Sequence, residues 1–166
     1  AASNESENSA NVAVTTAAYS ATPLTAAPVP TWPANQVKSL YSNTYLFAPA
    51  GLNSYNEGWW AAPAMTEGNV DGNTYLYYTL ANDGMIGWQY AETSVASMEN
   101  LHIDIWASAS GTISIRPITI EGPETRKSLT LVAQQWNSFD IPLSEFGAHD
   151  YTKLFQFAIE YWNAGG

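Results

Sequence analysis

Acidic side chains are the groups of this chain that could carry acid–base chemistry. Cleaving a glycosidic bond requires two carboxyl groups roughly 5 to 10 Å apart across a cleft. Glu121 and Glu124 flank a Gly-Pro turn, where both are expected to be solvated. Asp104 and Glu160 could share a sheet face, but no pattern marks them as an acid and base pair. For Glu160 the expected role is a hydrogen bond or an ion pair with Arg116.

The sequence shows no other catalytic arrangement. His102 and His149 are its only histidines and it has no cysteine. Thiolate chemistry is therefore excluded, and no Ser-His-Asp order, phosphate loop or dinucleotide fingerprint occurs. The chain is predicted not to be an enzyme. No cofactor is expected, with a structural calcium ion left open because oxygen ligands at the ends of a β-sandwich could hold one.

Aromatic residues are more abundant than a core of this size requires. The chain has seven tryptophans and ten tyrosines, while only 12% of its residues are charged. Trp and Tyr pack best where one end of the side chain stays in contact with water. A sugar ring offers a C–H face for such rings and a rim of hydroxyls for amide, carboxylate or guanidinium groups. The composition therefore favours an aromatic surface that binds neutral polysaccharide.

Alternating residues indicate which side chains face away from the core. A strand sends successive side chains to opposite faces. Leu101–Trp106 places three aliphatic residues on one face, and Leu154–Trp162 places Phe155, Phe157, Ile159 and Tyr161 on one face. The predicted outward residues on these two strands and on Thr112–Ile118 are His102, Asp104, Trp106, Ser114, Arg116, Gln156, Ala158, Glu160 and Trp162.

Short β-type segments separated by turn residues predict an all-β fold, with no helix of three turns. A single helical turn is expected at 144–146. Regularly spaced strands are typical of a sandwich of two antiparallel sheets. The predicted strands are Val37–Ser42, Thr74–Leu80, Met85–Tyr90, Leu101–Ala107, Thr112–Ile120, Ser128–Val132, Asn137–Pro142 and Leu154–Trp162.

Two regions of different composition divide the chain. Residues 1–35 have no Lys or Arg and contain four of the nine prolines, so they are predicted to form an extended linker or arm. Within it, Asn11–Tyr19 has enough β-branched residues to form a strand where a sheet edge accepts it. Residues 36–166 are predicted to form the β-sandwich domain.

The tryptophans are expected to divide between structural and binding roles. Trp106 and Trp136 are predicted to pack against the core, and Trp32 to dock the proline-rich arm. Trp59 and Trp60 lie in a loop-like segment, where one is expected to be buried and one exposed. In the strand that follows, Trp88 is assigned to the core and Gln89 to the groove.

Charge and hydropathy exclude further classes of partner. The formal net charge of −10 argues against nucleic acid, which requires clustered Lys and Arg. No run of about 18 apolar residues occurs, so no membrane span is predicted. The first ten residues lack the pattern of a signal peptide, so any export signal is expected to have been removed or never present.

Four segments in order resemble the non-catalytic β-sandwich carbohydrate-binding modules of secreted glycan-degrading enzymes from Bacteroidetes-type bacteria. They are Gln36–Tyr45, Leu101–Trp106, Trp136–Leu143 and Leu154–Phe157, within a similarity covering about residues 30 to 163. The resemblance implies a jelly-roll fold, secretion or display on the bacterial surface, and an attached glycoside hydrolase. Its groove positions correspond to Gln89, Arg116, Gln156 and Glu160, and its loop tryptophan to Trp59 or Trp60. Trp162, on the same face as Gln156 and Glu160, completes the predicted ligand-binding set for xylan or a β-glucan.

The sequence differs from these modules in two ways, and the differences suggest an alternative function. They commonly have an acidic residue where this chain has Asn43, and they continue past the position of Gly166 into one more strand. We therefore expect a sandwich that could lack its last strand, leaving an open sheet edge. The alternative function is a structural subunit that forms filaments, in which the extended N-terminal segment Asn11–Pro30 of one copy pairs with the open sheet edge of a neighbour. Without such exchange the chain is expected to be a monomer.

Overall fold

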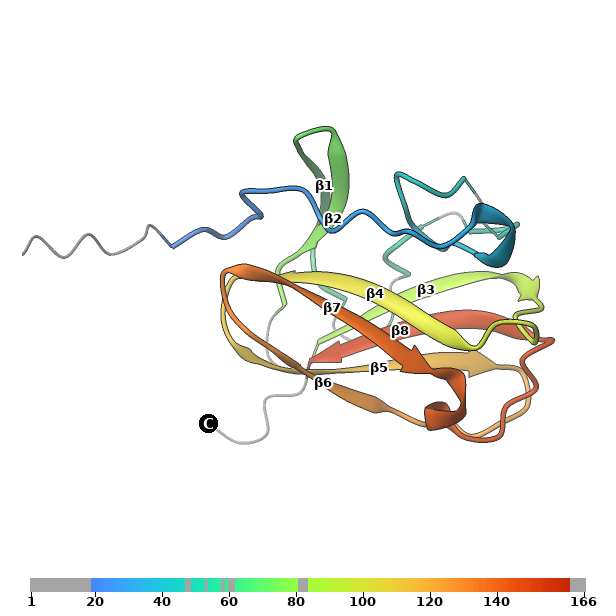
Figure 1. Cartoon of the computed structure of the whole chain (residues 1–166). Coiled ribbons are helices and arrows are strands. Elements are labelled where there is room, and N and C mark those ends of the chain that lie inside the picture. Colours follow the sequence, from blue (N-terminus) through green and yellow to red (C-terminus); the bar gives the residue numbers. More distant parts are fainter. Residues whose placement is uncertain are drawn as a thin grey trace, which may run out of the picture.

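The computed structural model describes residues 19–46, 49–52, 54–57, 59, 62–80 and 84–161, and within them the fold is all-β. This confirms the predicted fold class. Two short 3-10 turns, η1 and η2, accompany the strands (Figure 1). The elements are η1 (Ala34–Gln36), β1 (Met65–Val70), β2 (Asn73–Tyr78), β3 (Gly84–Thr93), β4 (Asn100–Ala107), β5 (Gly111–Thr119), β6 (Lys127–Leu131), β7 (Gln135–Pro142), η2 (Leu143–Phe146) and β8 (Leu154–Tyr161).

The strands form layers consistent with a β-sandwich. Four antiparallel strands make the larger sheet in the order β3-β8-β5-β6. The antiparallel pair β4-β7 lies across one face of this sheet, and the β1-β2 hairpin stands to one side (Figure 1). Jelly-roll connectivity remains a prediction.

The core lies between the larger sheet and the β4-β7 pair, where alternation placed it. Ile86, Trp88 and Tyr90 point inward from β3, and Phe157 and Ile159 from β8. On β4, Leu101, Ile103 and Ile105 pack against this cluster as predicted. Phe146 of η2 is fully buried, so the expected helical turn closes one end of the core.

Two segments differ from the predicted strands. Val37–Ser42 forms no strand, although Val37 is extended. The second is β1, which was not among the predicted strands and pairs with β2 through a turn at Asp71 and Gly72, with φ of 52° and 79°. Positive φ at both central residues is what the Asp-Gly turn of a hairpin requires. That dipeptide was the available sequence signal for β1.

The described part of the N-terminal arm lies against the β4-β7 layer. The Ser20 N–H donates to Gln134 Oε1 at 2.8 Å, and Gln134 Nε2 donates to the Ser20 carbonyl at 2.8 Å. The Trp136 indole N–H donates to the Thr25 carbonyl at 2.9 Å. Trp32 is 58% exposed, and its carbonyl accepts a hydrogen bond from the Tyr45 hydroxyl at 2.7 Å. No helix in the described ranges is long and apolar enough to cross a membrane.

Candidate functional site

The structure brings five of the seven predicted ligand-binding residues onto the outer face of the larger sheet. Trp60 and Trp162 lie outside the described residues. Trp59 lies in a loop, and the other four lie on strands. The register of β3, β8 and β5 sets these four in three rows, since residues paired across strands share a face. The rows are Gln89 with Gln156, then Gly87 with Ala158 and Arg116, then Met85 with Glu160 and Ser114.

Trp59 lies directly over the middle row. A Cβ atom at Gly87 would overlap the six-membered ring of the Trp59 indole, so glycine is needed for the ring to lie this close to the sheet. Ala158 beside it is fully buried. The loop is held to the sheet by the Glu57 N–H, which donates to the Gly87 carbonyl at 2.9 Å. Trp59 is thus a partly exposed indole on a floor of two small residues.

Two glutamine amides form the row next to the indole. Gln156 Nε2 donates to Gln89 Oε1 at 2.9 Å in an exposed contact. The two donors of Gln89 and the carbonyl oxygen of Gln156 make no other hydrogen bond within the described part of the chain. Gln89 is exposed and Trp88 buried, which confirms the predicted orientation of this strand. The pair therefore offers both donors and acceptors to a hydroxylated ligand.

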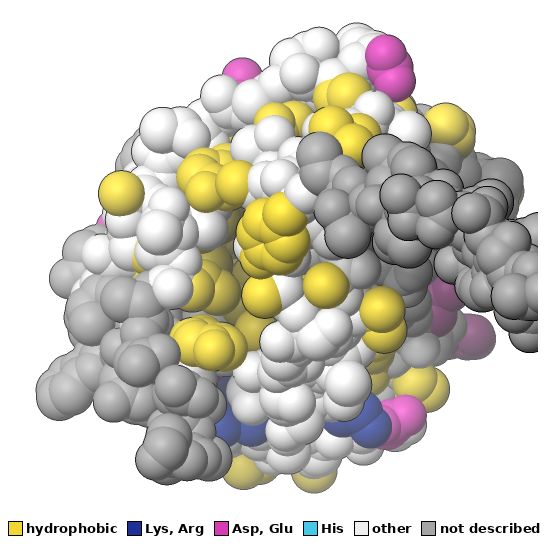
Figure 2. Space-filling model, turned by 90° about the vertical axis from the view of Figure 1, so that its left-hand side faces the viewer, with side chains coloured by type: hydrophobic (Ala, Val, Ile, Leu, Met, Phe, Trp, Pro, Cys, Tyr) yellow, Lys and Arg dark blue, Asp and Glu magenta, His cyan; other side chains and the backbone are white. Residues whose placement is uncertain are grey.

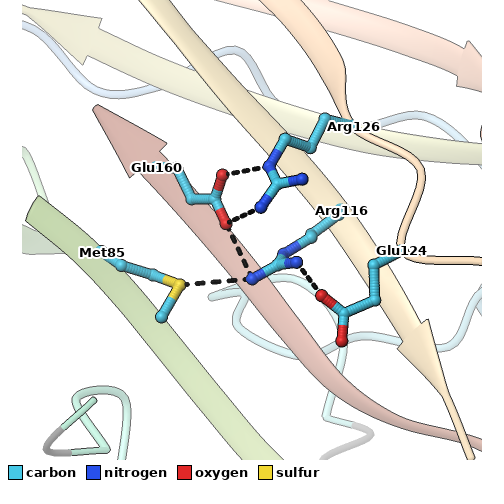
Figure 3. A network of polar contacts seen from close by, with 5 residues as sticks. All are labelled: Met85, Arg116, Glu124, Arg126 and Glu160. Carbon is cyan, nitrogen blue, oxygen red and sulfur yellow. Dashed lines mark hydrogen bonds and ion pairs between the residues drawn. The ribbon is translucent and has the colours of Figure 1, made fainter. Parts of the chain in front are cut away.

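Arg116 and Glu160 are buried in a network of ion pairs (Figure 3). The Glu160 side chain is 1% exposed and accepts from Arg116 Nη2 at 2.8 Å and from Arg126 Nε at 2.5 Å. Glu124 is a second partner of Arg116. The hydrogen bond with Glu160 raises the pKa of Arg126 above its ordinary value.

This burial corrects the assignment of Arg116 and Glu160 as groove residues that contact sugar hydroxyls. Both lie on the predicted face, and their pairing matches the alternative weighed for Glu160. They are unavailable to a ligand because Glu124 and Arg126, which lie between β5 and β6, supply charges that bind them. The alternation of residues predicts which face of a strand a side chain lies on. It does not predict whether another segment of the chain covers that side chain.

A second polar face, on the outside of β4-β7, was not part of the predicted site. His102 contacts Asp140 through Nδ1 at 2.8 Å and Asp104 through Nε2 at 3.1 Å. The Ser138 hydroxyl donates to Asp104. The alternation of Leu101–Trp106 had already indicated that His102 and Asp104 point outward.

The indoles of Trp106 and Trp136 also lie on this outer face, with ring centroids 6.1 Å apart in an edge-to-face arrangement. Neither indole belongs to the core cluster, so the prediction that they pack against the core is wrong. Trp106 faces outward because Ile105 before it packs against the core, and Trp136 shares that face because it pairs directly with Trp106. The bond from Trp136 to Thr25 shows that this face holds the arm.

His102 makes the stability of this face depend on pH. Burial lowers its pKa, but hydrogen bonds with Asp140 and Asp104 outweigh that effect and leave the pKa raised. The charged ring therefore stabilises the fold fully below its ordinary value of about 6.5. This stabilisation is lost as the pH rises through the raised value. We expect it to be worth less than about 1 kcal/mol, because the His102 and Asp140 side chains are substantially exposed.

Urea unfolding at pH 5.5 and pH 8.5 tests this expectation. The free energy of unfolding of the parent should fall between the two pH values by more than that of His102→Gln. Comparing the two proteins cancels the other titrating groups. An equal pH dependence in both would contradict the assigned role of His102.

Comparisons with family models, with curated proteins and with solved structures returned no match to this chain. Among the residues that the structure describes, no group of three or more His, Asp or Glu is placed to hold a metal ion.

Proposed function

We propose that the chain is a non-catalytic module that binds a neutral glycan, such as xylan or a β-glucan, on the outer face of the β3-β8-β5-β6 sheet. The observation that supports it most is the partly exposed Trp59 indole over Gly87, in the row beside the Gln89–Gln156 pair. A flat ring and a polar edge are the two groups that a sugar ring needs. The module would hold polysaccharide near an attached glycoside hydrolase, and its predicted location is secreted or on the cell surface.

In this proposal the ion-pair network lies beside the site on the same sheet face and supports it without contacting the ligand. Arg116 shares a row with Gly87 and Ala158, and its Nη2 atom lies 3.5 Å from Met85 Sδ. It thus fixes the part of the sheet on which Trp59 rests. The ligand contacts of the proposed site are consequently reduced to Trp59, Gln89 and Gln156.

Net charge limits the class of glycan. A chain of net charge −10 repels polyanions at low salt, so neutral polysaccharides are favoured over those rich in uronic acid. Native affinity electrophoresis tests this with gels that contain xylan, mixed-linkage β-glucan or polygalacturonate. Gln89→Ala is a suitable variant because the side chain is exposed and its removal leaves the core intact.

A further inference from the structure

Strand β4 pairs with β7 along one edge, and the register of this pair defines what its other edge presents. Opposed residues of an antiparallel pair alternate between hydrogen-bonded and non-hydrogen-bonded. The Leu143 N–H donates to the Glu99 carbonyl at 2.8 Å, and Pro142, which lies opposite Asn100, has no N–H. The odd positions of β4 therefore bond to β7. The even positions direct their N–H and C=O groups to the other edge, and they are Asn100, His102, Asp104 and Trp106.

This second edge of β4 is open. Within the described ranges, no backbone hydrogen bond joins the four even positions to any segment on that side. Unpaired N–H and C=O groups along an edge are a template for an added strand. An extended peptide can pair with such an edge, and its main-chain hydrogen bonds then contribute the affinity.

A cavity of about 1170 Å³ runs along the open edge. All of β4 lines it, whereas β7 contributes Trp136 and Asp140, and β2 and residues 35–45 also border it. Figure 2 shows hydrophobic side chains in recesses of the face at the end where the arm leaves the sandwich. Pockets for small molecules hold roughly 300 to 1,000 Å³. A larger space along the whole length of an open strand favours an extended peptide over a compact ligand.

One side of an added strand would contact half-buried aliphatic residues. Leu101, Ile103 and Ile105 of β4 pack against the core but keep part of their surface exposed, as does Leu76 of β2. Because side chains alternate along a strand, every second side chain of the partner would face these residues. Phe157 also lines the cavity but is only 3% exposed, so the partner would extend the edge of the core without entering it.

The other side of an added strand would lie beside carboxylates. Asp104 and Asp140 are on the outer face, and His102 between them can offset at most one of their charges. Among the described residues that line the cavity, Lys38 is the one Lys or Arg, and its ammonium group donates to the Ser94 carbonyl at 2.5 Å. The acidic residues that line it are Glu99, Asp104 and Asp140. Basic side chains on the partner would complement this charge.

We propose that the open edge of β4 binds an extended segment of another protein, in which aliphatic residues alternate with Lys or Arg. The half-buried aliphatic residues select one side of that segment and the carboxylates select the other. A second copy of this chain is a poor partner, because two molecules of net charge −10 repel each other. The surface is separate from the proposed glycan site, which lies on the outer face of the other sheet.

Hydrogen exchange of the full chain, followed by NMR, tests whether the edge is open. In the free chain, the amides at positions 102, 104 and 106 should exchange rapidly, while those at 101, 103 and 105 are protected by β7. An octapeptide that alternates Val and Lys should slow exchange at the even positions by about tenfold or more at saturation. Protection of the even positions before any peptide is added would overturn the proposal.

Calorimetric titration with matched octapeptides tests the chemistry of the partner. The first control alternates Val with Glu, the second has the same Val and Lys residues in two blocks, and the third is the Val/Lys peptide N-methylated throughout. They reverse the charge, remove the alternation and remove the N–H donors. Each should bind about tenfold or more weakly than the Val/Lys peptide. Equal binding by any of the three, or no binding by the Val/Lys peptide, would overturn the proposal.

Variants of the chain locate the basic side of the peptide. Asp104→Asn with Asp140→Asn should weaken binding of the Val/Lys peptide by about tenfold. The matched control, Glu121→Gln with Asp150→Asn, removes the same charge from exposed residues that do not line the cavity and should bind as the parent does. Equal losses in both pairs would assign the effect to net charge and overturn the proposal. None of these results bears on glycan binding at Trp59.

Discussion

Replacing Glu160 by Gln is expected to lower the free energy of unfolding by about 3 kcal/mol. Removing one partner of a buried ion pair leaves the other charge without compensation and typically costs about 3 to 5 kcal/mol. Arg116, with a side chain only 9% exposed, would lose its buried partner and keep Glu124. We therefore expect the lower end of that range. The change is measured by urea unfolding followed by circular dichroism.

Glu124→Gln is the control for this experiment. The Glu124 side chain is 55% exposed, so its removal should cost less than about 1 kcal/mol. A Glu160→Gln protein with unchanged stability that had lost glycan binding would contradict the structural role assigned here. That outcome would restore Glu160 as a groove residue.

Replacing Trp59 by Ala should weaken glycan binding by about thirtyfold. Aromatic residues at the centre of a binding site commonly account for about 2 kcal/mol or more, which corresponds to that factor in affinity. Among the three tryptophans predicted to stack on a sugar ring, Trp59 is the one within the described residues. Its ring lies on the floor formed by Gly87 and Ala158. Calorimetric titration of parent and variant with the same oligosaccharide measures the loss.

Trp32→Ala provides a matched control, because Trp32 is an exposed indole on the arm rather than on the larger sheet. It should bind as the parent does. Trp59→Phe retains an aromatic ring and should recover part of the affinity. Equal affinity of Trp59→Ala and the parent would exclude the proposed site, whatever the chain binds elsewhere.

Local patterns were sufficient to predict most of the strands and their faces. The alternation of Leu101–Trp106 and Leu154–Trp162 reports a two-residue period that any half-buried strand must obey. It therefore placed Gln156 and Glu160 on one face correctly. The same reasoning put Trp88 inward and Gln89 outward, as the structure shows.

The features of the site that the sequence did not predict depend on contacts between residues far apart in the chain. The burial of Arg116 depends on Glu124 and Glu160, and Glu160 lies 44 positions further along the chain. The outward position of Trp136 is stabilised by Thr25, more than 100 residues away. Val37–Ser42 has the composition of a strand, yet a strand also needs a partner. Glycine is needed at Gly87 because the Trp59 ring lies directly above it, and this contact between two segments is not visible in the local sequence.

Affinity electrophoresis of the parent chain against neutral and anionic polysaccharides tests the central claim most directly. Retardation by xylan or a mixed-linkage β-glucan, absent with polygalacturonate and reduced in Gln89→Ala, is the predicted result. Migration unaffected by every polysaccharide would contradict a glycan-binding role for this sheet face.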